Sequence, residues 1–210
     1  MPLHKIEWTG RQCGWALWNI TEPEQALAAL AQPEVCPKDI QSPTKRLEWL
    51  AGRVLLMQLL DNAGLTYRGL RKDAFGKPFL DGYSHPISLS HSYPYVAAQI
   101  DLQTPVGIDV EQPKAKLLTI AHRVLGPTEE IDAGKDITKN CVYWCAKEAL
   151  YKIYGQRGLT FSKHLRIQPF TLNQRGNLVG RISTPDRDSL INLGYRVEED
   201  FVLVYTKNGL

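Results

Sequence analysis

Hydrophobic residues along the chain recur in two patterns, one typical of helices and one typical of strands. In the first pattern they return every three or four residues, which places them on one side of a helix. This pattern covers residues 22–31, 44–62, 115–125 and 138–155. In the second pattern, short apolar runs or alternating apolar and polar residues lie between turn-forming residues, as in strands. It covers residues 14–20, 66–70, 78–80, 86–90, 95–102, 106–111 and 165–207.

The order of these elements predicts an α+β fold that is repeated twice along the chain. The stretch 165–207 has turn-forming residues at three places, so it predicts a meander of three or four antiparallel strands. The dipeptide Thr104-Pro105 interrupts the pattern and separates the halves 1–104 and 105–210. Each half is expected to place a long helix against an antiparallel sheet. A short internal match, Trp49-Leu-Ala-Gly-Arg53 with Trp144-Cys-Ala-Lys-Glu148, lies on the long helices of the two halves.

Two acids share one face of the strand predicted at 106–111. In Val106-Gly-Ile-Asp-Val-Glu111 the apolar residues alternate with Gly107, Asp109 and Glu111. Side chains two residues apart in a strand point to the same side, so both carboxylates are expected to project together into a cleft. Gly107 would leave room for a ligand beside them. The alternative interpretation is a half-exposed strand with a solvated acidic face.

Charged residues also lie on the helix predicted at 138–155. Trp144, Glu148 and Lys152 are spaced four residues apart and therefore share one face. An exposed ion pair between Glu148 and Lys152 is one explanation of this spacing. Apolar residues surround much of the same helix, however, which predicts that it is largely buried. Buried acids and lysines, including Lys147, then need partners or a chemical role.

Five sequence blocks, taken in order, resemble those of a known enzyme family. They are Lys45-Arg-Leu-Glu-Trp-Leu-Ala-Gly-Arg53, Gly76-Lys-Pro78, Ser88-Leu-Ser-His-Ser92, Gly107-Ile-Asp-Val-Glu111 and Trp144-Cys-Ala-Lys-Glu-Ala-Leu-Tyr-Lys152. Together they are similar to the 4'-phosphopantetheinyl transferase superfamily, in particular its larger, surfactin-synthetase-type branch. The resemblance implies a pseudo-dimer of two similar α+β halves within one chain. It places the coenzyme A nucleotide on the half 1–104, and the metal and catalytic acids on the half 105–210.

The resemblance also implies a reaction. Such enzymes transfer the 4'-phosphopantetheine arm of coenzyme A to a serine of an acyl or peptidyl carrier protein and release 3',5'-ADP. Asp109, Glu111 and Glu148 would bind Mg²⁺, which prefers oxygen ligands and typically binds a few carboxylates together with substrate phosphates. Glu148 is the first candidate for the general base, and Glu111 is the second. Lys152 would contact a phosphate oxygen during transfer.

Further residues would bind coenzyme A according to the same resemblance. His91 and Ser90 would contact a phosphate, and Lys77 the nucleotide or its 3'-phosphate. Arg46 and Arg53 are candidates for the 3'-phosphate because a guanidinium can bind phosphate with two hydrogen bonds. The remaining residue of this group is Lys147, which would contact a phosphate or face the carrier protein. Glu129 matches another acid of the family pattern, although Glu130 beside it leaves the register open.

Composition limits the class of protein. The chain has 210 residues, of which 43% are hydrophobic and 22% charged, as in ordinary globular proteins. A net charge of +3 without a basic run does not favour nucleic-acid binding. No apolar run approaches a membrane span and the first residues contain no apolar signal segment, so we expect a cytoplasmic protein. The pseudo-dimeric length of the chain favours a monomer. The four cysteines contain no CxxC pair, which favours buried thiols over a metal site or disulfides.

Two functional classes remain open on the sequence. The first is the Mg²⁺-dependent transferase, whose acceptor could be a fatty-acid, polyketide or peptide-synthetase carrier. The second is an inactive module of the same fold that binds coenzyme A or a carrier protein. The usual phosphate-binding loops, with Gly-x-x-x-x-Gly-Lys-Ser/Thr or Gly-x-Gly-x-x-Gly spacing, are missing from the sequence. An unrelated nucleotide-binding enzyme is therefore disfavoured.

Overall fold

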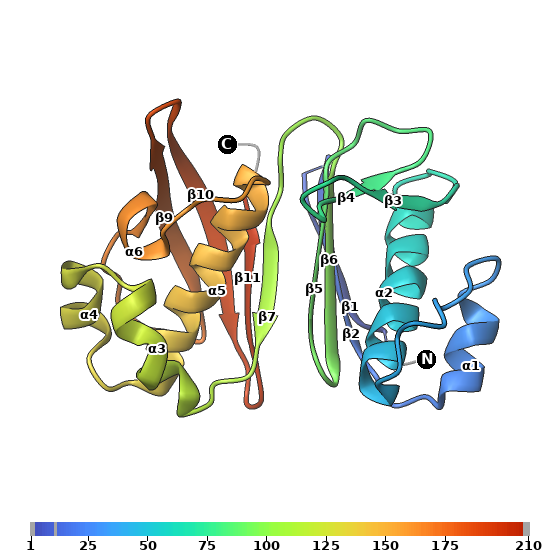
Figure 1. Ribbon diagram of the computed structural model, residues 1–210, viewed down its shortest axis with the longest axis horizontal. Helices are drawn as coiled ribbons and strands as arrows, with labels where there is room; N and C mark the ends of the chain where they lie inside the picture. Colours follow the sequence, from blue (N-terminus) through green and yellow to red (C-terminus); the bar gives the residue numbers. More distant parts are fainter. Residues whose placement is uncertain (1–2, 11, 208–210) are drawn as a thin grey trace. The chain divides into compact units, whose positions relative to one another are not determined.

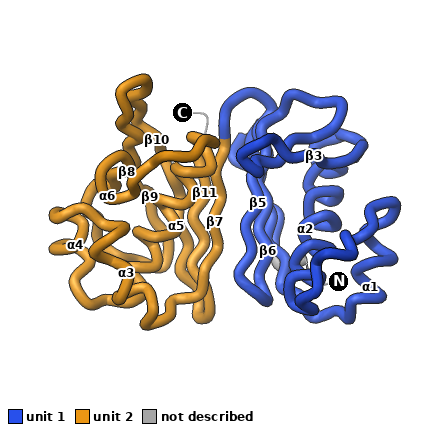
Figure 2. The backbone as a smooth tube through the Cα atoms, in the orientation of Figure 1, with its two compact units in different colours: residues 1–105 blue, residues 106–210 orange. Residues whose placement is uncertain are grey.

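A long helix packed against an antiparallel sheet occurs in both parts of the chain. In the computed structural model, which describes residues 3–10 and 12–207, the chain divides into two units. Unit 1 is Met1–Pro105 and unit 2 is Val106–Leu210 (Figure 2). Each unit has its own cluster of buried apolar side chains between its main helix and its sheet. The architecture of helices and antiparallel sheets confirms the α+β prediction (Figure 1).

The sheet of unit 1 has the strand order β1-β2-β6-β5, and every neighbouring pair is antiparallel. Its strands are β1 (Leu3–Thr9), β2 (Cys13–Asn19), β5 (Ile87–Ser92) and β6 (Tyr95–Asp101). The main helix α2 (Pro43–Asn62) packs on this sheet, and α1 (Glu24–Leu30) packs on α2. A small hairpin of β3 (Leu70–Lys72) and β4 (Pro78–Leu80) lies between α2 and β5 in the sequence. Helix α2 starts where it does because Ser42 accepts a hydrogen bond from the Lys45 backbone N–H.

The sheet of unit 2 has the strand order β7-β11-β10-β9-β8, also antiparallel. Its strands are β7 (Ile108–Glu111), β8 (Leu165–Ile167), β9 (Arg175–Thr184), β10 (Arg187–Val197) and β11 (Val202–Thr206). The main helix α5 (Ile137–Tyr154) packs on the sheet. The shorter helices are α3 (Lys116–Val124), α4 (Pro127–Ala133) and α6 (Phe161–His164). Helix α5 begins after Asp136, which accepts from Lys139 N–H, and ends at Gly155 in the left-handed conformation.

The two sheets share part of their strand order. In unit 1 the strand before the helices, β2, pairs with the last strand, β6, which pairs in turn with β5. In unit 2 the corresponding strands are β7, β11 and β10, in the same relative order. In both units the main helix follows the first of these strands and precedes the other two in sequence.

Most predicted elements are present, with a few differences. The predicted long helices correspond to α2 and α5, and the tail forms the predicted meander as β8 to β11. The strand predicted at 66–70 is wrong, because the backbone there is irregular and β3 begins only at Leu70. Strand β1 and helices α4 and α6 were not predicted. In β1 the register shifts between Leu3 and Lys5, which breaks the simple alternation on which the prediction relies.

Two expectations about the chain as a whole can be compared with the structure. All four cysteines, Cys13, Cys36, Cys141 and Cys145, are buried thiols, as predicted. Within residues 3–10 and 12–207, no helix combines the length and the apolar character needed to cross a membrane.

Candidate functional site

The acids of β7 lie beside helix α5. Strand β7 pairs with β11, opposite Val204 at Asp109 and opposite Val202 at Glu111. The Lys152 ammonium on α5 donates to Asp109 Oδ1 at 2.7 Å and to the Ile108 carbonyl at 2.7 Å. Asp109 is 6% exposed, so it faces the helix rather than an open cleft. The structure therefore brings together Asp109 and Lys152, which the sequence placed in the same site.

Gly107 has a different role from the one expected. A Cβ atom at this position would lie 2.0 Å from the carbonyl oxygen of Ala149 in α5. The glycine therefore allows β7 and α5 to approach each other at van der Waals distance, and the space beside it is filled by the helix. The expectation that Gly107 leaves room for a ligand is wrong. Its effect is to bring the acidic end of β7 close to Glu148 and Lys152 on the helix.

Glu148 is electrostatically coupled to both acids of β7. Burial and, after it, the carboxylates of Asp109 and Glu111 raise the pKa of Glu148 to about 7, while Lys152 opposes them. Glu111 is more accessible, with its Oε2 atom 3.9 Å from the Lys116 ammonium. Three carboxylates beside Lys152, with Lys116 near one of them, form a site of concentrated negative charge. Each can be neutralised by a proton or by a cation.

The same carboxylates have the right chemistry for a hard metal ion. Carboxylate oxygens are the protein ligands that Mg²⁺ prefers, and the ion usually keeps several waters. A divalent cation would relieve the repulsion that raises the pKa of Glu148. In the part of the chain that the structure describes, no group of three or more His, Cys, Asp or Glu side chains is arranged so that it could hold a metal ion. The chemistry of the three carboxylates suits Mg²⁺, but in this structure they are not grouped around a common metal position.

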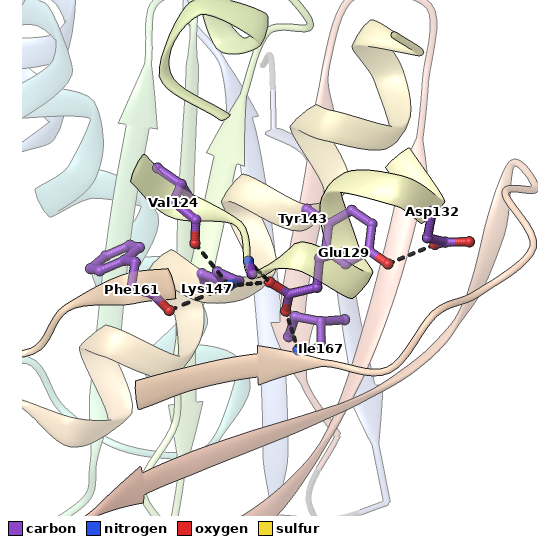
Figure 3. A network of polar contacts seen from close by, with 8 residues as sticks. Val124, Glu129, Asp132, Tyr143, Lys147, Phe161 and Ile167 are labelled. Carbon is purple, nitrogen blue, oxygen red and sulfur yellow. Dashed lines mark hydrogen bonds and ion pairs between the residues drawn. The ribbon is translucent and has the colours of Figure 1, made fainter. Parts of the chain in front are cut away.

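Lys147 lies in the core, not in the acidic site (Figure 3). Its ammonium is 0% exposed and donates to Glu129 Oε2 at 2.5 Å, to the Val124 carbonyl at 2.9 Å and to the Phe161 carbonyl at 3.3 Å. Burial lowers the pKa of Lys147, while Glu129 raises it. A phosphate or a carrier protein could reach this group only if the network opened. The expectation that Lys147 contacts a ligand is therefore not supported by its position.

Glu129 is the centre of this buried network. Its carboxylate accepts from the Gly126 N–H at 2.6 Å and the Ile167 N–H at 2.7 Å, in addition to Lys147. A second contact lies nearby, in which the Tyr143 hydroxyl donates to Asp132 Oδ2 at 2.6 Å (Figure 3). Sequence reasoning singled out Glu129 as a family acid but did not find its partner. The network holds the segments around α4, α6 and β8 onto helix α5, next to Glu148.

Unit 1 contains a cavity of about 430 Å³ lined by charged and apolar side chains. Its lining includes three of the predicted coenzyme A ligands, Arg53, Ser90 and His91. Lys77 itself does not line the cavity, but its neighbours Gly76 and Pro78 do. The other lining residues are Ile40, Lys45, Glu48, Trp49, Gly52, Leu70, Lys72, Leu89 and Val96. A volume of this size is in the range of small-ligand sites, and the cations favour an anionic ligand.

The two candidate arginines differ in position. The Arg53 guanidinium stacks over the Trp49 ring, 4.2 Å from its centroid, and lies at the cavity wall. Its Nε atom is 3.9 Å from Glu34 Oε2. Arg46, in contrast, is bound by Glu24 at 2.6 Å and is not among the residues that line the cavity. The structure therefore groups Arg53 with His91 and Ser90 but leaves Arg46 in a surface ion pair.

One residue of this cavity was missed by sequence reasoning. Glu48 on α2 is 4% exposed, and its carboxylate accepts from the Lys45 ammonium at 2.7 Å and the Tyr93 backbone N–H at 3.0 Å. The His91 ring nitrogen Nδ1 lies 3.2 Å from Glu48 Oε2. Burial raises the pKa of Glu48, but the bonds from His91 and Lys45 outweigh it and lower the value to about 2. No sequence pattern links Glu48 to His91, because the pairing is long-range.

Part of the chain is similar in sequence to known proteins. Residues 105–206 match the sequence profile of the 4'-phosphopantetheinyl transferase superfamily. A protein of Haemophilus influenzae, provisionally named a 4'-phosphopantetheinyl transferase, is 32% identical over 113 residues, which are 49% of this chain and 48% of that protein. A 4'-phosphopantetheinyl transferase of Bacillus subtilis is 29% identical over 133 residues, which are 60% of this chain and 55% of that protein.

The chain thus spans about half the length of the curated relatives that it matches. The profile match contains β7, with Asp109 and Glu111, and α5, with Glu148 and Lys152. The acidic site therefore lies wholly inside the matched segment. The segment 105–206 is therefore similar to the 4'-phosphopantetheinyl transferase superfamily.

Proposed function

We propose that this protein transfers the 4'-phosphopantetheine arm of coenzyme A to a serine of an apo carrier protein. The serine oxygen attacks the β-phosphorus of the pyrophosphate, the bond from that phosphorus to the bridging oxygen breaks, and 3',5'-ADP leaves. The observation that carries the proposal is the coupling of Glu148 to Asp109 and Glu111 beside Lys152. The family of the matched segment supports the same reaction.

We propose that Asp109, Glu111 and Glu148 hold Mg²⁺ in the acidic site. When bound, the ion offsets the negative charge on the pyrophosphate oxygens. Lys152 would add a positive charge beside the same phosphates, because its ammonium is partly exposed while it binds Asp109. In this arrangement the acids bind and orient, and the lysine stabilises developing charge.

Glu148 is the first candidate to accept the serine proton. A pKa of about 7 lets its carboxylate take a proton near neutral pH, where a general base is most useful. Glu111 remains the second candidate, since its carboxylate lies in the same acidic site and its side chain is 19% exposed. After transfer, the proton leaves the base to solvent and the carboxylate is restored.

Coenzyme A would bind at the cavity of unit 1. Arg53, Ser90 and His91 line this cavity, and Lys77 adjoins it, so these residues are proposed to contact the nucleotide and its phosphates. The shared strand order of the two units supports the further proposal that the chain is a pseudo-dimer of two similar halves. A monomer is proposed because one such chain holds both halves. Arg46 stays a weaker candidate because Glu24 already binds it.

Intact-mass spectrometry tests the proposed reaction. An apo carrier protein, incubated with this protein, coenzyme A and Mg²⁺, should gain the mass of one phosphopantetheine arm. The gain should disappear with EDTA and with Asp109→Ala or Glu148→Gln. Asp188→Asn is a matched control, since Asp188 pairs with Arg181 on the surface of β10. Normal transfer by the Asp109 or Glu148 variants would contradict the metal assignment.

The alternative function is an inactive module of the same fold. Such a protein would bind coenzyme A or a carrier without any gain of mass on the carrier. Acyl and peptidyl carriers should both be included, so that a narrow acceptor preference is not taken for inactivity. Coenzyme A binding without transfer to any carrier of the panel would favour the module.

A further inference from the structure

Glu48 is a buried carboxylate in a cavity that otherwise presents cations. Lys45, Arg53 and Lys72 line the same cavity, which suits an anionic ligand. A carboxylate there repels an anion, and burying its charge is costly unless neighbouring groups pair with it. The partners of Glu48 indicate the role of its carboxylate. They are the Lys45 ammonium, the Tyr93 backbone N–H and the His91 ring.

The contact between Glu48 and His91 determines which ring nitrogen carries a proton. An ionised carboxylate only accepts hydrogen bonds, so Nδ1 of His91, 3.2 Å from Glu48 Oε2, must be the donor. This leaves Nε2 as the nitrogen that can meet a ligand in the cavity that His91 lines. A histidine whose Nδ1 is held in this way has a defined ring orientation.

Glu48 is itself held firmly. It lies on helix α2, whereas His91 and Tyr93 lie in and just after β5. Because three donors converge on one buried carboxylate, its position is determined by the helix and the strand together. The His91 side chain, in contrast, is half exposed and would rotate without this contact.

We propose that Glu48 is a positioning residue that orients His91 toward a phosphate of coenzyme A. In the complex the ring carries both protons, with Nδ1–H donating to Glu48 and Nε2–H donating to the phosphate. The inference rests on the proposed binding of coenzyme A in unit 1, and adds to it a residue that does not touch the ligand's phosphate. Arg53 and Lys45 provide further positive charge in the same cavity.

A double-mutant cycle on coenzyme A binding tests the proposal. Calorimetry should show about 10-fold weaker binding for Glu48→Gln, by analogy with the loss of a carboxylate behind a metal-binding histidine. His91→Ala should weaken binding as well. In the His91→Ala background, Glu48→Gln should change the affinity by less than about 2-fold, since the two residues act through one contact. With His91 present, Glu48→Asp should bind coenzyme A more tightly than Glu48→Gln, because it keeps a carboxylate.

Several controls separate positioning from a general structural role. Glu7→Gln, which removes a surface carboxylate paired with Lys5, should leave the affinity unchanged. A loss of fold would weaken binding equally with and without His91, and that additive result would overturn the proposal. Nitrogen chemical shifts of the His91 ring give a second readout that needs no ligand. Nδ1 should be protonated in the wild-type protein, and Glu48→Gln should alter its shift; unchanged shifts would also overturn the proposal.

The outcomes also distinguish this inference from the proposed reaction. Coenzyme A binding with the expected non-additivity, but without transfer to a carrier, would reject the reaction and support the role of Glu48. Transfer with additive effects of the two substitutions would support the reaction and reject the role of Glu48. A wild-type protein that does not bind coenzyme A would overturn both.

Discussion

Replacement of Lys147 by methionine tests the role of the buried network most directly. The substitution keeps an unbranched apolar stem of similar length but removes the ammonium. Three acceptors then lose the hydrogen bond from Lys147: the Glu129 carboxylate and the carbonyls of Val124 and Phe161. Glu129 is 2% exposed, so its charge would be left buried without a counterion. The remaining donors to it, the Gly126 and Ile167 N–H groups, carry no net charge.

The expected loss follows from this burial. Removing one partner of a buried ion pair destabilises a protein by about 3–5 kcal/mol, because the other charge stays unpaired. We expect a loss in this range from Lys147→Met. The pair need not be more stabilising than apolar residues would be, since burial lowers the pKa of Lys147 despite its bond to Glu129. In the double variant Lys147→Met with Glu129→Gln, the buried charge is gone and part of the stability should return.

Guanidinium unfolding followed by circular dichroism measures the change in the free energy of unfolding. Hydrogen exchange of peptides from α4, α6 and β8 would locate it, because these segments carry the partners of the network. A loss below about 1 kcal/mol together with abolished transfer would refute the reasoning. That pair of results is what a ligand-contacting lysine would give, as the sequence alone suggested.

Three further predictions concern other charged or tightly packed positions. In EDTA at pH 8, Glu148→Gln should raise the free energy of unfolding by about 1–3 kcal/mol and with it the thermal midpoint, since a carboxyl whose pKa is raised from 4.5 to about 7 is destabilising when ionised; calorimetry measures this. Glu48 has its pKa lowered from 4.5 to about 2, so its contribution, up to about 3 kcal/mol, is present above pH 4.5 and lost as the pH falls toward 2; acid unfolding of wild type and Glu48→Gln should differ in that window. Gly107→Ala should cost about 1–3 kcal/mol or more in urea unfolding, because the new methyl would overlap the Ala149 carbonyl.

Each of these has an outcome that would contradict it. A lower midpoint for Glu148→Gln would mean that Lys152 stabilises the carboxylate more than its neighbours repel it. Parallel acid unfolding curves would show that Glu48 is not ionised through its contacts. For the glycine, Gly52→Ala on α2 is the matched control, since its nearest neighbour would be Val96 Cγ1 at 3.8 Å. Equal stability of the two alanine variants would refute the close contact at Gly107.

Local patterns predicted the elements that repeat a clear period. Helices α2 and α5 and the hairpins of the tail follow from apolar spacing and turn residues, so their positions were predicted within a few residues. The irregular backbone before Leu70 was not predicted, because its short apolar segment resembles a strand. The acidic pair in β7 was also recognised from a local period, since alternation in a strand places both acids on one face.

Long-range pairings could not be read from the sequence. Lys147 and Glu129 are partners in the core, yet the spacing of Lys147 on its helix equally suits a ligand contact. Glu48 and His91 come together only because α2 packs on the sheet that contains β5. A periodicity describes one element at a time, whereas these contacts depend on how two elements pack. The close approach of Gly107 to α5 belongs to the same class.

The buried cysteines make it possible to measure the rate at which each unit opens locally. Cys13 and Cys36 lie in unit 1, and Cys141 and Cys145 lie in unit 2. Burial raises the pKa of Cys36 and Cys145, so neither thiol reacts readily with an alkylating reagent until its surroundings open. Peptide mapping after timed alkylation would therefore give a separate rate for each unit from a single sample. The native cysteines therefore report the rate of local opening in each unit without an added label.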